Sequence, residues 1–266
     1  NEWIKYSFFI FLSAFAASII IDIDKSMISK LLALENVAYY AVAVFIAAVI
    51  DTPSRAMFQI VNPLVSEAIS NNDKNRLEEL LKKSSMSLFL ISGLIFLLIN
   101  TNIGDIYNVV ESINKIQGYS IAIPVVLIIS ISKLYTSTIG CVNNIISNSN
   151  FYQYILFFSI FSALSLFFLN IYFIKNIGLV GAAYSTLIII VVFNLLKILL
   201  VLVKLKIQPY SINSIKLFFI ITVLYLIFSN LEFDFLSAIY SLIIKSIIIA
   251  IIYISICYYL NISKEI

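Results

Sequence analysis

Long uninterrupted apolar stretches dominate this chain and decide what it can fold into. Residues 8–21, for example, contain no charged side chain. Apolar residues make up 62% of the 266 residues and charged residues only 12%, whereas soluble domains are roughly half apolar and a quarter charged. A soluble fold of this size could not bury so much apolar surface. The sequence therefore predicts a chain that folds in a lipid bilayer.

Eight stretches are long and apolar enough to cross the hydrocarbon core, which takes roughly 20 residues of helix. Runs such as LFLISGLIFLLI (88–99) do not alternate between apolar and polar residues, so helices are predicted and barrel strands are not. The predicted fold class is all-α, a polytopic membrane protein with about eight transmembrane helices. The predicted spans are residues 5–33, 37–61, 84–101, 118–140, 152–174, 179–203, 213–229 and 236–260.

The longest charged connection between spans is SNNDKNRLEELLKKSS (70–85). Leu77, Leu80 and Leu81 recur there at helical spacing, which predicts a short amphipathic helix on the membrane surface.

Lysine and arginine are distributed unevenly between the two sides of the predicted topology. With the amino terminus inside, three cations fall outside: Lys30, Lys115 and Lys175. Ten fall inside: Lys5, Lys74, Arg76, Lys82, Lys83, Lys197, Lys204, Lys206, Lys216 and Lys264. Because cytoplasmic loops carry the excess of cations, eight spans predict that both ends of this chain are cytoplasmic.

Charged residues also occur within the predicted spans, where an ionised group costs roughly 2.5–3.5 kcal/mol. Such residues persist where they face a partner or a wet cavity. The seven candidates are Asp22, Asp24, Lys25, Asp51, Arg55, Lys133 and Lys245.

In the first span, Asp22 and Lys25 share one helical face with Ser18 and Ser29. Asp24 lies on the other side of the helix and is predicted to face a neighbouring helix. Asp22 and Lys25 form either a structural ion pair or part of a polar pathway.

In the second span, a stripe runs through Asp51, Arg55, Gln59 and Asn62. Pro53 within it predicts a kink whose freed carbonyls a wet cavity could satisfy. Asp51 and Arg55 are either an ion pair within the kinked helix or pathway residues.

A third stripe follows Lys133, Ser137, Gly140 and Asn144 in the fourth span. Lys133 has no acid at helical spacing, which favours a pathway role. Three striped helices predict a shared aqueous cavity. Lys245, which belongs to none of these stripes, is expected to extend along the lipid-facing surface.

The sequence offers little for catalysis or metal binding. It contains no histidine, which is the commonest general base and metal ligand. Cys141 and Cys257 lie in apolar runs and read as buried hydrophobes. Asp22 and Asp24 could be read as a D-x-D metal motif, but two carboxylates on opposite faces of a spanning helix cannot chelate one ion together. No metal, organic cofactor or nucleic-acid partner is expected.

Several stretches resemble polysaccharide (Wzx-type oligosaccharide or O-antigen) flippases of the multidrug/oligosaccharidyl-lipid/polysaccharide (MOP) exporter superfamily. DKSMISKLLALENVAYYAVAVFIA (24–47) is similar to the start of the second half of these proteins. VNPLVSEAIS (61–70), followed by NDKNRLEELLKKS, resembles their cytoplasmic connection. IGLVGAAYSTLI (177–188) resembles their G-x-x-G-A-A-x-x-T signature, in which Gly178, Gly181, Ala182 and Ala183 would allow close helix packing.

The resemblance implies twelve to fourteen helices in two six-helix lobes. Residues 1–206 would form the second transport lobe and residues 207–266 two appended transmembrane helices, while the first lobe would precede this chain. The implied setting is the bacterial cytoplasmic (inner) membrane, with polysaccharide polymerase machinery as a further partner.

The implied activity is flipping of oligosaccharide repeat units linked to undecaprenyl diphosphate, by alternating access. Only Asp24 and Lys25 match the family closely enough to carry over, whereas Arg55 and Lys133 follow from position. Lys25, Arg55 and Lys133 would attract the diphosphate and the glycan. The acids Asp22, Asp24 and Asp51 would hold those cations or take part in coupling to H⁺ or Na⁺.

Two other classes of function stay open at this point. A multidrug or metabolite antiporter of the same superfamily would have the same fold. A membrane-embedded polysaccharide polymerase or ligase would usually carry a large outer catalytic loop, whereas the longest outer loop predicted here, about 101–117, offers only Asp105, Glu111 and Lys115.

Overall fold

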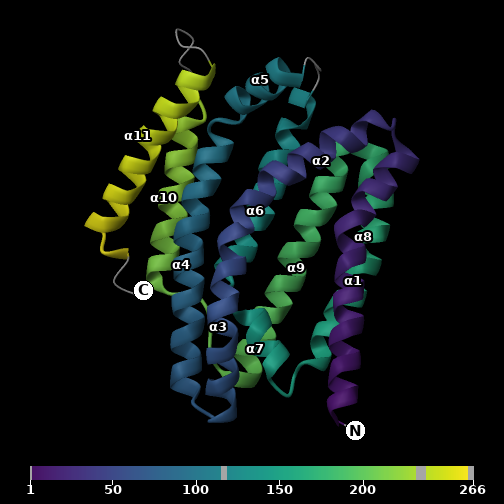
Figure 1. Ribbon diagram of the computed structural model, residues 1–266, viewed down its shortest axis with the longest axis vertical. Helices are drawn as coiled ribbons and strands as arrows, with labels where there is room; N and C mark the ends of the chain where they lie inside the picture. Colours follow the sequence, from purple (N-terminus) through teal and green to yellow (C-terminus); the bar gives the residue numbers. More distant parts are fainter. Residues whose placement is uncertain (1, 115–118, 232–237, 263–266) are drawn as a thin grey trace.

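The computed structural model describes residues 2–114, 119–231 and 238–262, and all regular secondary structure within them is helical (Figure 1). The predicted all-α fold class is confirmed. In chain order the elements are α1 (Glu2–Leu31), α2 (Glu35–Ala48), η1 (Val49–Asp51), α3 (Thr52–Ser70), α4 (Lys74–Asn100), α5 (Ile103–Asn114), η2 (Tyr119–Ala122), α6 (Ile123–Thr138), α7 (Val142–Asn148), α8 (Gln153–Ile177), α9 (Leu179–Leu205), α10 (Ile212–Phe228) and α11 (Ala238–Tyr259).

Each predicted span corresponds to one helix or to consecutive helices that follow one another without a loop. By length and composition, 6 segments of the described part of the chain could cross a membrane: Glu35–Ser70, Lys74–Asn100, Tyr119–Thr138, Gln153–Ile177, Leu179–Leu205 and Ile239–Tyr259. The other two predicted spans correspond to the 30-residue α1 and to α10, which is shorter at 17 residues.

The second predicted span is bent where the sequence places Asp51 and Pro53. The α-helical course of α2 gives way to the 3-10 turn η1, and α3 restarts with the proline in its first turn. In Figure 1, α2 crosses the upper part of the molecule obliquely whereas α3 descends along α4. The buried Ser92 hydroxyl of α4 donates to the Ile50 carbonyl at 2.8 Å. A neighbouring helix thus satisfies this carbonyl. The carbonyl that Pro53 frees is that of Val49, and it accepts the Thr52 backbone N–H, so neither carbonyl depends on a wet cavity.

The connection at 70–85 is not a separate surface helix. From Lys74 onward it forms the first turns of the continuous 27-residue α4, and the Asp73 carboxylate caps that helix by accepting from the Arg76 backbone N–H at 2.9 Å. Leu77, Leu80 and Leu81 are buried in a hydrophobic cluster shared with α3, α7 and α9. This segment is an amphipathic helix, as predicted, but its apolar face packs on other helices. The prediction of a separate helix on the membrane surface is therefore wrong.

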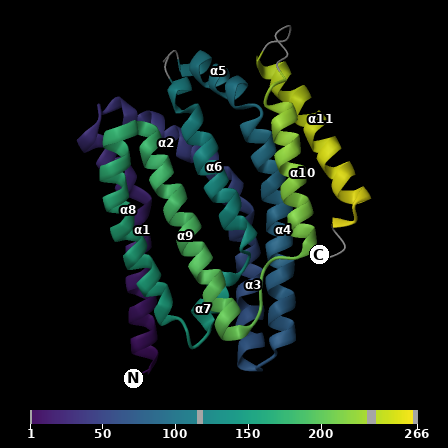
Figure 2. The same ribbon diagram turned by 180° about the vertical axis from the view of Figure 1, so that it is seen from behind.

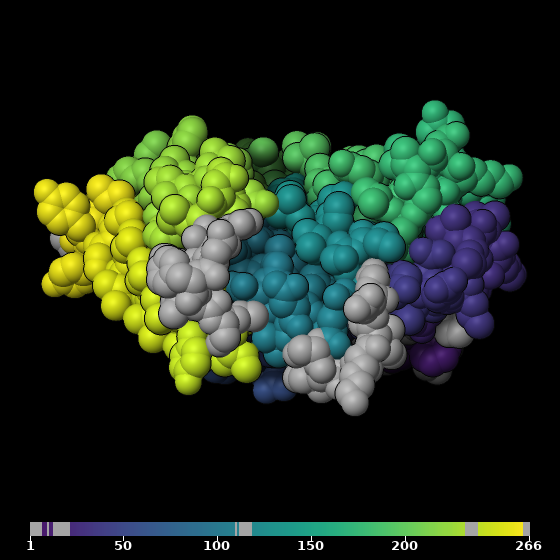
Figure 3. Space-filling model, turned by 90° about the horizontal axis from the view of Figure 1, so that it is seen from above, coloured from purple at the N-terminus to yellow at the C-terminus, as the bar shows by residue number. Residues whose placement is uncertain are grey.

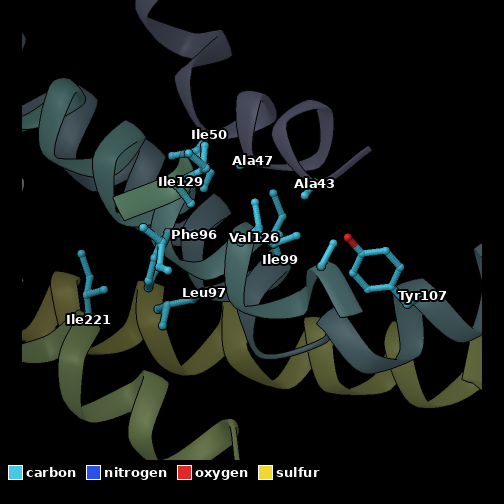
Figure 4. Packing of buried hydrophobic residues seen from close by; sticks show 14 of the residues in the cluster. Ala43, Ala47, Ile50, Phe96, Leu97, Ile99, Tyr107, Val126, Ile129 and Ile221 are labelled. Atoms are coloured by element: carbon cyan, nitrogen blue, oxygen red, sulfur yellow. The ribbon is translucent and has the colours of Figure 1, made fainter. Parts of the chain in front are cut away.

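Neighbouring helices form an extended, flattened bundle. Helix α8 lies between α1 and α9, α6 packs on α9, α4 and α2, and α4 packs on α3 (Figures 1 and 2). Figure 3 shows the yellow C-terminal helices and the purple N-terminal part at opposite ends of the molecule. The larger core cluster joins α2, α4 and α6, and Figure 4 shows Ala47, Ile50, Phe96, Val126 and Ile129 from these helices and η1 gathered there.

Helices α10 and α11 dock on the same core. α10 packs against α4, and α11 packs against α4 and α5. The Tyr253 hydroxyl of α11 donates to the Leu90 carbonyl of α4 at 2.8 Å. The division of the chain at residue 206 stays a prediction, although the chain does leave α9 there, with Lys206 in the left-handed region at φ 57°.

Lys245 does not extend along the lipid-facing surface as the sequence predicted. Only 5% of it is exposed, and its ammonium group donates to the carbonyl oxygens of Thr101 at 2.6 Å and of Leu231 at 2.8 Å. These carbonyls follow the C-terminal ends of α4 and α10, where the helix dipole favours a cation. Lys245 therefore ties α11 to the ends of two other helices.

We expect Lys245→Met to destabilise the folded protein by about 2 kcal/mol, because it removes charge-assisted hydrogen bonds from buried carbonyls. The measurement is thermal unfolding of the purified protein in detergent. Lys216→Met, which changes an exposed lysine on α10, is the matched control and should shift stability by no more than about 0.5 kcal/mol. Equal melting temperatures for the two variants would contradict this role for Lys245.

Candidate functional site

A buried carboxylate joins four helices near one end of the bundle. Asp24 of α1 is 5% exposed. Its Oδ2 accepts hydrogen bonds from the Tyr40 hydroxyl of α2 and the Thr186 hydroxyl of α9, both at 2.7 Å. Its Oδ1 accepts from the Asn170 side-chain amide of α8 at 2.6 Å. We call Asp24, Tyr40, Asn170 and Thr186 the Asp24 cluster.

The helices bring these residues to one depth because each lies about two turns or less from the end of its helix at the same end of the bundle. Asp24 and Asn170 lie near the C-terminal ends of α1 and α8, and Tyr40 and Thr186 near the N-terminal ends of α2 and α9. In Figure 1 this is the upper end, where α1 is followed by α2 and α8 by α9. Asp24 thus points at neighbouring helices, as its position on the helix relative to Asp22 predicted.

The electrostatics of the Asp24 cluster depend on donated hydrogen bonds. Burying a carboxylate is costly unless polar partners replace water. Three donors do so here. The Asn170 Oδ1 atom, however, is buried and has no hydrogen-bond partner among the described residues. The cluster therefore contains a carboxylate, two hydroxyl groups and an amide group whose oxygen has no partner among the described residues.

The other charges of the first span form an ion pair, which is one of the two alternatives that the sequence left open. Lys25 Nζ lies 3.1 Å from Asp22 Oδ1, with 37% and 72% of the two side chains exposed. The pair therefore lies on the surface of this chain, away from the buried side of α1 that carries Asp24.

Arg55 and Gln59 of α3 are exposed and Asp51 is half-buried. Among the described residues, Asp51 and Arg55 form no ion pair with each other or with another residue. The alternative in which Asp51 and Arg55 form an ion pair within the kinked helix is therefore wrong. Arg55 is available to an external partner.

The polar stripes of the second and fourth spans meet at their lower ends. Asn62 Oδ1 of α3 accepts hydrogen bonds from the side-chain amides of Asn144 at 3.0 Å and Asn148 at 2.9 Å, both on α7. Higher on this stripe, Lys133 of α6 is half-buried, and within the described part of the chain its ammonium group has no ion-pair partner.

The predicted shared aqueous cavity is not among the described pockets. One of these pockets lies between the α3–α4 turn and the ends of α7 and α9, and another is lined by α8. Neither is lined by Lys25, Arg55 or Lys133. The pathway roles of these cations stay predictions.

Helices α8 and α9 approach each other closely at the small residues quoted above. Gly178 alone connects the two helices, at φ 64° and ψ −139°, a conformation that essentially only glycine adopts. A Cβ atom on Gly181 would lie 2.2 Å from the Phe173 carbonyl oxygen. Ala182 and Ala183 are fully buried. This contact holds Asn170 and Thr186 on adjoining helices.

Sequence reasoning missed Tyr40, Asn170 and Thr186 as members of the site. A signal was present for Asn170, a polar residue in the otherwise strongly apolar run LFFLNIYF (166–173). Thr186 stands inside the quoted signature but carried no charge to mark it. Tyr40 is one of many tyrosines, and nothing local distinguishes it.

The observations above define a class of protein, an all-helical membrane protein of several spans with a buried carboxylate between its helices. No family model matches the chain, and no curated protein matches its sequence. Two solved structures are similar in fold. One is the outward-facing conformation of a multidrug resistance MATE family transporter of the MOP superfamily, with TM-score 0.62 and 18% identity.

The other is a MOP superfamily transporter from Pyrococcus furiosus, with TM-score 0.61 and 18% identity, in which the reverse polarity of the binding pocket suggests a different function. Each alignment covers 85% of this chain and 51% of the solved one. The chain therefore spans about half the length of these transporters and has a MATE-like fold of the MOP type.

Proposed function

We propose that this chain forms one lobe of a cation-coupled exporter that works by alternating access in a bacterial cytoplasmic membrane. The observation that carries the proposal is the Asp24 cluster, a buried carboxylate held between four helices of a fold that known transporters share. Polar and ionisable groups inside a membrane protein are costly and commonly functional. The remaining half of such an exporter would supply the opposing lobe.

The coupling ion we propose for the Asp24 cluster is Na⁺ or H⁺. Asp24, the spare Asn170 oxygen and the hydroxyls of Tyr40 and Thr186 would hold Na⁺, which prefers such hard oxygen atoms. Alternatively, Asp24 would bind a proton and donate it to one of the same oxygens. Either ion neutralises the carboxylate and changes which hydrogen bonds tie α1 to α2, α8 and α9. A ligand with different affinity for two arrangements of these helices shifts the balance between them.

The substrate class we propose is an oligosaccharide on an anionic diphosphate lipid. Its support comes from the exposed Arg55 and the half-buried Lys133, which have no ion-pair partner among the described residues. The half-buried Lys25 adds a third cation, although it is paired with Asp22. A surface with such cations attracts phosphate groups. A multidrug antiporter is equally compatible with the fold, since one similar structure is a multidrug resistance transporter.

We expect Arg55→Ala and Lys25→Ala to lower glycan export by about tenfold each, because a lost charge-assisted contact weakens anion binding by about that factor. The measurement is surface glycan in cells that lack the native gene and carry the full-length variant, with protein abundance measured in parallel. Arg76→Ala is the matched control, because Arg76 pairs with Glu79 at 2.8 Å on the exposed start of α4.

Full glycan export by the Arg55→Ala, Lys25→Ala double variant would contradict the proposed substrate class. If the same variant instead changed the efflux of a fluorescent organic cation, the multidrug alternative would be favoured.

A further inference from the structure

A pocket that the proposed transport function does not use lies beside the turn from α3 to α4, which is at the lower end of the bundle in Figure 1. Its volume is about 420 Å³, within the size range of small-molecule sites. Four segments line it: the end of α3, the start of α4, the connection from α7 to α8, and the end of α9. Lys74 of α4 and Lys204 of α9 bring two cations to its wall. We call it the α4–α9 pocket.

The two pocket lysines differ from the other cations at the start of α4. Arg76, Lys82 and Lys83 are each paired with Glu78 or Glu79 on their own helix, at 2.7–3.3 Å. Within the described residues, Lys74 and Lys204 take part in no ion pair. The wall of the α4–α9 pocket therefore carries lysine charges that no acid at this end of the bundle compensates within the described residues.

One acid lines the α4–α9 pocket, and it is already engaged. The Asp73 carboxylate accepts the Arg76 backbone N–H at 2.9 Å as the cap of α4. Lys204 Nζ lies 5.9 Å from the centre of the Phe151 ring, a distance at which the ring attracts the cation. Two lysines against one capping aspartate leave the pocket wall with a net positive charge.

Apolar side chains form one side of the lining, next to the polar Ser70, Asn72, Ser149 and Asn150, and this apolar side continues into the exposed surface of α8 and α9. Leu77, Phe151 and Leu205 line the pocket beside the lysines. Phe151 contacts the Tyr154 ring of α8 at 6.4 Å between centroids, and Val203, next to Lys204 on α9, is 69% exposed. The cavity thus combines cations with an apolar side at a helix end, the level at which lipid headgroups lie.

We propose that the α4–α9 pocket binds the phosphate of an anionic phospholipid headgroup, with Lys74 and Lys204 as the phosphate contacts and the acyl chains along Tyr154 and Val203. A soluble phosphate would share the contacts with the lysines but would gain nothing from the apolar side. The inference concerns a resident lipid and does not depend on what the protein transports.

The test is native mass spectrometry of the full-length protein titrated with phosphatidylglycerol, phosphatidylcholine or inorganic phosphate. We expect saturable binding of phosphatidylglycerol that is tighter than binding of phosphatidylcholine. Lys74→Gln and Lys204→Gln should each weaken it by about fivefold, the factor that corresponds to roughly 1 kcal/mol per lysine near a charged membrane surface. Lys82→Gln, which removes the same charge outside the pocket, should change it less than twofold.

Three results would overturn the proposal. The first is equal binding of phosphatidylglycerol by the wild type and the Lys74→Gln, Lys204→Gln double variant. The second is an effect of Lys82→Gln as large as that of either pocket variant, which would indicate diffuse surface charge. The third is binding of inorganic phosphate at the pocket lysines without binding of phosphatidylglycerol.

Discussion

Asp24→Asn is expected to lower transport by roughly a hundredfold, a loss within the usual range of coupling between two binding sites, while the protein stays folded in the membrane. The side-chain amide has the shape of the carboxylate but cannot carry its charge or its proton. Its oxygen can still accept from Tyr40 and Thr186. Its amide nitrogen can donate to the Asn170 oxygen that now lacks a partner, once the Asn170 amide turns over.

Asp24→Ala makes the complementary test of the same site. This change removes both acceptor oxygens and leaves the Tyr40, Asn170 and Thr186 donors unpaired in a buried place. We expect a loss of about 3 kcal/mol or more in stability, since each unsatisfied buried group costs about 1–3 kcal/mol. Thermal unfolding of the purified protein measures the stability of both variants, and transport is assayed in reconstituted vesicles.

Asp22→Asn is the control for the Asp24 variants, because Asp22 is 72% exposed and bonded only to Lys25 among the described residues. It should retain most of the transport activity and the wild-type melting temperature. Transport by Asp24→Asn equal to that of Asp22→Asn would leave the Asp24 cluster with a structural role alone.

The second large effect is expected at the contact between α8 and α9. Gly181→Ala should destabilise the protein by about 3 kcal/mol, because its Cβ would lie 2.2 Å from the Phe173 carbonyl oxygen and 2.8 Å from the Ile174 backbone nitrogen. Backbone atoms cannot move aside as a flexible side chain can, so the two helices must separate. Thermal unfolding and the yield of folded protein from membranes measure the effect.

Gly104→Ala is the matched control for Gly181→Ala. Gly104 lies in α5, and a Cβ atom there would meet nothing within 4 Å. Alanine is favoured over glycine in a helix by about 1 kcal/mol, so this variant should be neutral or slightly more stable. A Gly181→Ala protein as stable as Gly104→Ala would show that α8 and α9 are not held at this distance.

Local patterns in the sequence predicted much of this fold. Apolar length predicted the helices, Pro53 predicted the kink before α3, and the three- and four-residue spacings predicted that Asp22 and Lys25 share one face of their helix. These features depend on residues close together in the chain. The direction of Asp24 followed in the same way from its place on the helix relative to Asp22.

Contacts between distant segments could not be read from the sequence. One of the two acceptors of the Lys245 ammonium group, the Thr101 carbonyl, is 144 residues away in the sequence. No local pattern distinguishes a buried lysine from one that reaches the membrane surface. The start of α4 looked amphipathic, which fits both a surface helix and a helix packed on protein. The partners of Asp24 stand on three other helices, so only the assembled bundle reveals them.

The most direct test of cation binding at Asp24 is the melting temperature of the full-length protein with and without Na⁺ at acidic and alkaline pH, for the wild type and Asp24→Asn. If Na⁺ binds, it should raise the wild-type melting temperature, and more so at alkaline pH, where protons compete less. If only H⁺ binds, the wild type should depend on pH but not on Na⁺. In Asp24→Asn, the dependence of the melting temperature on Na⁺ or on pH should be smaller than in the wild type. The same pH and Na⁺ dependence in both proteins would contradict a cation site at Asp24.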